Sequence, residues 1–189
     1  MNTPNKLTML RVMLVPVFLV FLMVSRIPYN FLYALAIFIA ASLTDLLDGY
    51  LARKNNQVTT FGKFLDPLAD KVLVLSAMIC FIQLELASSV AVVIVIAREF
   101  MVTSLRLVAV SGSGKVIPAG FLGKLKTVIS MVSVIGILVL SGLAQMISLP
   151  AAIDIPAISH GLMWLCAGIT LISGIWYVVR NWDSIGTMK

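Results

Sequence analysis

Long apolar runs separated by short polar segments dominate this chain. The runs lack the strict alternation of apolar and polar residues that the strands of a membrane barrel need. Six of them are long enough to cross a hydrocarbon core of about 30 Å as helices. They lie around residues 9–25, 29–52, 64–84, 87–110, 126–148 and 160–180. The pattern predicts an all-α integral membrane protein with six transmembrane helices.

The segments outside these runs complete the expected organisation. The first residues mix polar groups with Leu and Met, which predicts a short interfacial segment, and Thr3 before Pro4 is a plausible helix start. No internal repeat or low-complexity segment stands out. We expect a single membrane domain over residues 1–189, made of an interfacial segment at 1–8, a six-helix bundle at 9–180 and a cytoplasmic tail at 181–189.

Composition and charge placement support a membrane location. Hydrophobic residues make up 60% of the chain and charged residues only 12%, too few to cover a water-facing surface. The net charge of +6 does not indicate nucleic-acid binding, because the cations stand at the ends of apolar runs and form no basic arm. With the N-terminus inside, only Arg26 falls on the outer side. The positive-inside rule therefore predicts that both termini are cytoplasmic.

Four of the eight acidic residues stand close together, at Asp45, Asp48, Asp66 and Asp70. A carboxylate near the apolar phase costs about 2.5–3.5 kcal/mol at a helix centre, so such a concentration suggests a function. On two helices, the first pair shares one face and the second pair lies one turn apart. Two helices that meet at one level would bring the four carboxylates into one pocket, where divalent cations remove their repulsion. Ligands that are all oxygen favour Mg²⁺ or Mn²⁺.

Small residues accompany these acids. Gly49 and Ala52 lie on the same helix face as the first two aspartates, and Gly62 precedes Asp66 by one turn. They leave room for a flat ligand to approach the helix backbone, although close helix packing is an alternative explanation. Arg53 would supply a cation near the phosphates of such a ligand.

A second polar set interrupts the later apolar runs, at Arg98, Arg106, Lys124 and Lys126. These cations predict a basic pocket for an anionic substrate beside the metal ions. Two alternatives stay open: Arg98 pairs with Glu99 or with an aspartate of the acidic group, or the two lysines contact lipid headgroups. Residues two apart on a helix point nearly opposite ways, so the lysines share a target only if their helix begins at or after them.

The acidic stretch closely resembles a known family. Asp45-x2-Asp48-Gly49-x2-Ala52-Arg53-x8-Gly62-x3-Asp66-x3-Asp70 matches every fixed position of the signature of the CDP-alcohol phosphotransferase family. Other segments are similar to the bacterial phosphatidylglycerophosphate synthases of that family: Pro4-Asn5-x-Leu7-Thr8-x-x-Arg11, Ala97-Arg98-Glu99-Phe100, Arg106 and Gly123-Lys124-x-Lys126-Thr127.

The resemblance implies a reaction and a setting for it. CDP-diacylglycerol and sn-glycerol 3-phosphate would give phosphatidylglycerophosphate and CMP, a step of phospholipid biosynthesis. The family fold is a six-helix membrane domain that usually forms a homodimer. The resemblance further implies a bacterial protein that spans the cell membrane several times, with an active site that faces the cytoplasm.

The resemblance also implies roles for individual residues. Two Mg²⁺ (or Mn²⁺) ions would be held by Asp45, Asp48, Asp66 and Asp70, with Asp70 also the general base. CDP-diacylglycerol would be bound by Asn5, Thr8, Arg11, Gly49, Ala52, Arg53 and Gly62. The phosphate of glycerol 3-phosphate would be bound by Arg98, Arg106, Lys124 and Lys126.

Other functions are compatible with parts of the pattern. A sister enzyme would use another acceptor, such as inositol phosphate, serine or phosphatidylglycerol, and the cations argue only against a neutral one. A cation transporter would place its acids near the middle of the bilayer on broken helices, whereas here they cluster at one cytoplasmic edge. A lipid-binding scaffold without catalysis would leave the four acids unexplained.

Overall fold

The computed structural model describes most of the chain as helix. It places the backbone of residues 3–54, 60–113, 120–147, 150 and 153–181, and the side chains of residues 9–44, 71–106, 120–147, 150 and 153–181. Within these ranges the chain forms six helices and no strand. They are α1 (Thr3–Met23), α2 (Asn30–Lys54), α3 (Thr60–Gln83), α4 (Ser89–Ser113), α5 (Phe121–Met146) and α6 (Ile155–Arg180).

The six predicted helices are thus present, and four of them (α1, α3, α5 and α6) begin earlier than the apolar runs that predict them. Helix α1 is continuous from Thr3, the helix start expected from the sequence, so residues 3–8 form its first turns. Helix α5 begins at Phe121, after Gly120 in an extended conformation (φ −67°, ψ 171°). Helix α6 begins at Ile155, where the Asp154 side chain accepts a hydrogen bond from the backbone N–H of Ala157 (3.1 Å) and caps the helix.

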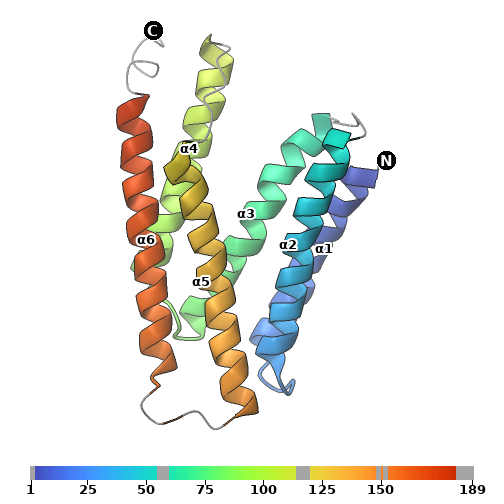
Figure 1. Ribbon diagram of the computed structural model, residues 1–189, viewed down its shortest axis with the longest axis vertical. Coiled ribbons are helices and arrows are strands. Elements are labelled where there is room, and N and C mark those ends of the chain that lie inside the picture. The colour runs from blue at the N-terminus through green and yellow to red at the C-terminus, as the bar shows by residue number, and fades with distance from the viewer. Residues whose placement is uncertain (1–2, 55–59, 114–119, 148–149, 151–152, 182–189) are drawn as a thin grey trace.

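The helices run roughly along one axis and pack in two groups (Figure 1). Helices α2 and α3 both pack on α1, and helices α4 and α5 both pack on α6. The groups meet where α5 contacts α2 and α3, and where α4 contacts α3. The start of α1, the end of α2, the start of α3 and the end of α6 all lie at the upper end of Figure 1. This end therefore carries the positions of the acidic signature.

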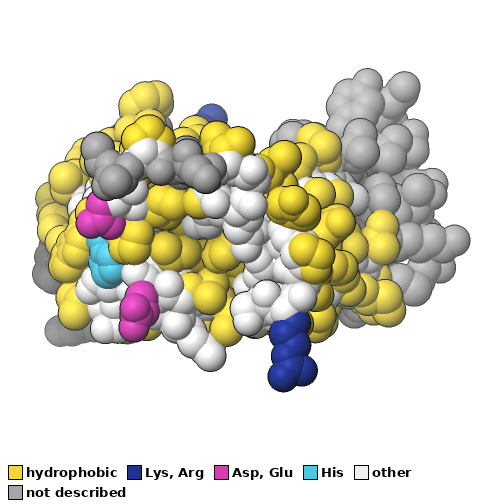
Figure 2. All heavy atoms as spheres, turned by 90° about the horizontal axis from the view of Figure 1, so that it is seen from below, with side chains coloured by type: hydrophobic (Ala, Val, Ile, Leu, Met, Phe, Trp, Pro, Cys, Tyr) yellow, Lys and Arg dark blue, Asp and Glu magenta, His cyan; other side chains and the backbone are white. Residues whose placement is uncertain are grey.

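Many large apolar side chains lie on the outside of the molecule, while several polar ones are buried beside an apolar core. Val93 and Ile172 are 61% exposed, whereas Ser173 and Thr170 are at most 1% exposed. Apolar residues cover much of the lower end of the molecule, where few Lys or Arg side chains are visible (Figure 2). Of the described helices, α5 and α6 are long and apolar enough to cross a membrane. An apolar exterior suits lipid, since lipid tails do not exclude such groups as water does.

Candidate active site

The signature positions lie on two helices joined by a short connection. Asp45 to Arg53 belong to the last turns of α2, and Gly62 to Asp70 belong to the first turns of α3. The backbone is helical through both segments, so positions three or four residues apart share a helix face. The side chains of residues 45–70 lie outside the described residues, and so do those of Asn5 and Thr8. Among the described side chains, no three metal-ligating groups cluster.

Arg11 is fixed against α2 close to the signature. Its side chain is only 1% exposed, and its Nε donates a hydrogen bond to the carbonyl oxygen of Ala41 (3.3 Å). The Thr44 hydroxyl donates to the same carbonyl (2.6 Å). Ala41 precedes Asp45 by one helical turn, so Arg11 joins α1 to α2 beside the first aspartate position.

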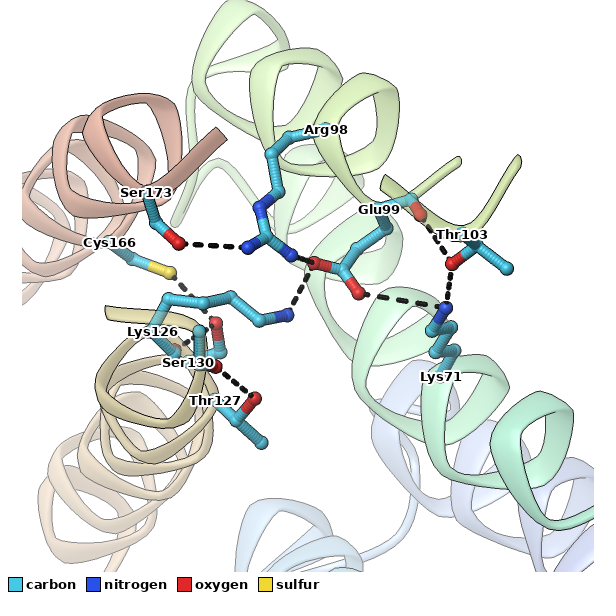
Figure 3. Close-up of polar contacts among 10 residues, drawn as sticks. Lys71, Arg98, Glu99, Thr103, Lys126, Thr127, Ser130, Cys166 and Ser173 are labelled. Carbon is cyan, nitrogen blue, oxygen red and sulfur yellow. Dashed lines mark hydrogen bonds and ion pairs between the residues drawn. The ribbon is translucent and has the colours of Figure 1, made fainter. Parts of the chain in front are cut away.

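A group of charges, buried except for the partly exposed Lys71, connects α3, α4 and α5, and we call it the Glu99 cluster (Lys71, Arg98, Glu99 and Lys126; Figure 3). Oε1 of Glu99 accepts a hydrogen bond from Nη1 of Arg98 (3.0 Å) and another from the Lys126 ammonium. Oε2 of Glu99 lies 3.9 Å from Nζ of Lys71. Glu99, Arg98 and Lys126 are 7%, 7% and 8% exposed.

Hydrogen bonds to neighbouring hydroxyl groups hold this cluster in place. Nη2 of Arg98 donates to the Ser173 hydroxyl of α6 (2.8 Å), so the cluster also contacts a fourth helix. The Lys71 ammonium donates to the Thr103 hydroxyl, which itself donates to the Glu99 carbonyl (2.7 Å). Nε of Arg98 has no partner among the described residues.

The other two predicted phosphate-binding residues are placed differently. The Arg106 guanidinium lies over the Tyr177 ring, 5.4 Å from its centroid, two turns along α4 from Arg98. Lys124 is exposed, whereas Lys126 is buried. Because α5 begins at Phe121, both lysines are inside the helix and point nearly opposite ways. The structure therefore brings Lys126 to Arg98 and leaves Lys124 outside the cluster.

Comparison with known proteins relates the whole chain to one group of enzymes. The model of the CDP-alcohol phosphatidyltransferase family matches residues 1–173. The chain belongs to this family. It is 40% identical to the CDP-diacylglycerol–glycerol-3-phosphate 3-phosphatidyltransferase of Bacillus subtilis over 98% of each chain. It is 37% identical to the protein of the same name from Rickettsia typhi, over 93% of this chain and 94% of that relative.

A third relative has a related name. The probable phosphatidylglycerophosphate synthase of Mycobacterium tuberculosis is 37% identical over 100% of this chain and 85% of the relative's own length. The family resemblance deduced from the signature is thus confirmed.

Two members of the Glu99 cluster were not predicted as site residues. Lys71 directly follows Asp70, and Glu99 directly follows Arg98, so each stood beside a predicted residue. Glu99 was expected only as a possible partner of Arg98. In a CDP-alcohol phosphatidyltransferase, a buried acid between several cations bears on substrate binding, because a phosphate ligand there would share those cations with it.

Proposed function

We propose that this protein transfers the phosphatidyl group of CDP-diacylglycerol to sn-glycerol 3-phosphate, and so forms phosphatidylglycerophosphate and CMP. The names of its relatives support this reaction, since two of them specify both substrates. The observation that carries the proposal is the position of Lys71. It follows Asp70, the last residue of the signature, and contacts Glu99 in the same cluster as Arg98 and Lys126. A basic acceptor pocket next to the signature is what this reaction needs.

The signature aspartates fit divalent metal ions by their chemistry and their helical spacing. Four carboxylates offer only hard oxygen ligands, which suit Mg²⁺ or Mn²⁺. Asp45, Asp48 and Asp66 would hold one ion. Asp45, Asp66 and Asp70 would hold the second. When bound, such ions supply charge neutralisation and Lewis-acid activation of a diphosphate.

The other signature residues would bind the donor. We propose that Gly49, Ala52 and Gly62 leave space for the cytidine and its phosphates, and that Arg53 supplies a positive charge there. Asn5, Thr8 and Arg11 would line the same nucleotide. The position of Arg11 between α1 and α2, one turn from Asp45, supports this assignment.

Asp70 would act as the general base. It would accept the proton of the attacking glycerol hydroxyl, whose oxygen forms the new bond to the phosphorus of the phosphatidyl group. The bond from that phosphorus to the CMP oxygen breaks, and CMP leaves with the electron pair. Atoms and charge balance, with one proton moved to Asp70.

The charge of the Glu99 cluster suits the acceptor. Its three cations and one carboxylate give a net charge of +2 among the described side chains, while a phosphate monoester carries about −1.5 to −2 at pH 7. Arg98 and Lys126 would bind this phosphate, and Arg106 would contribute from one side. Nε of Arg98 is a buried donor that such a ligand would satisfy. Lys124, on the other side of α5, is left out of this pocket.

The two lysines of α5 give a matched comparison. Replacing Lys126 with Ala should raise the KM for glycerol 3-phosphate roughly 10-fold or more, because a buried charge-assisted donor is lost. Replacing Lys124 with Ala should raise it less than about 5-fold, the range of an exposed charge. Initial rates of CMP release at varied acceptor measure both values. Equal effects of the two substitutions would contradict the proposed pocket.

We further propose that the protein is a homodimer that spans the cell membrane several times. The active-site end and both termini would face the cytoplasm. The sparse cations at the opposite end support this orientation, and the apolar exterior supports the membrane location. The homodimer is proposed from the family resemblance.

A panel of acceptors tests the proposed reaction against its sister reactions. Purified protein is given CDP-diacylglycerol, Mg²⁺ and one of glycerol 3-phosphate, inositol phosphate, serine or phosphatidylglycerol, and CMP is measured. We expect CMP release to depend on glycerol 3-phosphate. If inositol phosphate gave the higher kcat/KM, the family assignment would be unaffected and the proposed acceptor would be wrong.

A further inference from the structure

Glu99 links three helices directly and a fourth through Arg98. Its carboxylate contacts cations from α3, α4 and α5, and the Arg98 side chain that it holds is tied to Ser173 of α6. Figure 3 shows the Arg98 and Lys126 side chains converging on one carboxylate oxygen from different helices. A single anion therefore fixes the relative positions of cations that come from separate parts of the chain.

The cations would not hold this arrangement by themselves. Arg98 and Lys126 both contact Oε1 of Glu99, so their charged groups are close neighbours in a site that is less than 10% exposed. Like charges at such separations repel strongly where little water screens them. The carboxylate reverses this repulsion and also restricts two long, flexible side chains to one geometry.

Glu99 leaves donors of both side chains available. An ammonium has three N–H donors and a guanidinium has five. Among the described contacts, Lys126 uses one for Glu99, and Arg98 uses Nη1 for Glu99 and Nη2 for Ser173. Nε of Arg98 has no partner among the described residues. The cluster is therefore held together and still has N–H donors that could serve an anion.

We propose that Glu99 is a positioning residue for the acceptor: it holds Arg98 and Lys126 in the geometry that binds the phosphate of glycerol 3-phosphate. Through Lys71 it also fixes the turn of α3 that follows Asp70 against α4. This inference rests on the proposed function. Glu99, although an anion itself, would thus strengthen the binding of an anionic substrate.

The KM for glycerol 3-phosphate would fall on loss of the Glu99 charge if Glu99 only competed with the substrate for the cations. Removal of its charge would then raise the net charge of the cluster from +2 to +3, and the acceptor would bind more tightly. A merely structural Glu99 would give a third result, a lower fraction of folded protein with both KM values unchanged. The direction of the change in KM therefore separates these roles.

The experiment uses the full-length protein with Glu99 replaced by Gln, which keeps the shape and removes the charge. KM and kcat for glycerol 3-phosphate and KM for CDP-diacylglycerol are measured from CMP release, together with thermal stability in detergent. We expect the KM for glycerol 3-phosphate to rise roughly 10-fold or more, as for the loss of one charge-assisted contact, and the KM for the donor to change little. An unchanged or lower acceptor KM would overturn the proposal.

A second variant covers the case in which Glu99→Gln does not fold. Glu99→Asp keeps the charge and withdraws the carboxylate by one methylene, so the acceptor KM should also rise, and an unchanged value would overturn the proposal. Gln145→Leu is the matched control, since it removes a polar link between helices, to Asn30 (2.6 Å), outside the cluster. Its acceptor KM should equal that of the wild type. If the wild type itself released no CMP with glycerol 3-phosphate, the proposed function would fail, which is a separate result from an unaltered KM in the Glu99 variants.

Discussion

Replacing Asp45 or Asp66 with Asn is expected to abolish CMP release. Each of these residues is proposed to bridge both metal ions, and an amide is a weaker, neutral ligand for a hard cation. The loss of turnover should exceed that caused by any single substitution in the Glu99 cluster, because both ions would be affected. Initial rates at saturating CDP-diacylglycerol and Mg²⁺, with detection at long incubation times, measure the residual turnover.

The control for these variants is the same chemical change at a distant site. Asp154 caps α6, and Asn is an equally good cap, so Asp154→Asn should leave both rate and stability close to those of the wild type. Asp45→Asn and Asp66→Asn must remain monodisperse in detergent for the comparison to hold. Near-normal CMP release by either one, in folded form, would contradict the two-ion proposal.

Replacing Asp70 with Asn should lower the rate at least 100-fold, which is typical for the loss of a general base. CDP-diacylglycerol binding should be retained better than in Asp45→Asn, because Asp45, Asp48 and Asp66 would still hold one ion. Equilibrium binding of the donor and single-turnover rates separate these two effects. A variant that binds the donor normally and reacts at the full rate would show that Asp70 is not the base.

The order and number of helices followed from the apolar runs, but several helix ends did not. The fifth apolar run begins around residue 126, and the sequence left open whether the helix begins before the two lysines, because charged residues normally mark the end of a membrane span. In the structure both lysines belong to α5, since lysine is a good helix former and the helix extends beyond its apolar part. Helix α1 also continues into a polar segment, and its start at Thr3 is the one that Thr3 before Pro4 predicts.

The candidate site was predictable where it is local in sequence. The signature positions follow from spacing along two helices, and the family match supports that analysis. The Glu99 cluster depends on which helices pack together. Lys126 lies in the second turn of α5, whereas Lys71 lies about three turns into α3. The distance of each lysine from the start of its helix therefore did not reveal that both contact Glu99. The helices begin at different heights and α3 is tilted (Figure 1).

This difference explains why Lys71 and Glu99 were missed. Each residue alone has an ordinary structural explanation. Lys71 can be a charge near a helix end, and Glu99 can be an ion-pair partner of its neighbour Arg98. Their joint role appears only when α3, α4 and α5 are brought together. An acid inside an apolar run is costly unless it is paired, so Glu99 was a signal that several partners were to be expected.

The most direct test of the proposed reaction is the identity and amount of its lipid product. Purified protein is incubated with CDP-diacylglycerol, sn-glycerol 3-phosphate and Mg²⁺, and CMP and lipids are quantified by mass spectrometry. We predict one phosphatidylglycerophosphate for each CMP, and neither product without the acceptor. CMP formed together with phosphatidic acid, or equally fast without glycerol 3-phosphate, would show that water is the acceptor and would contradict the proposed transfer.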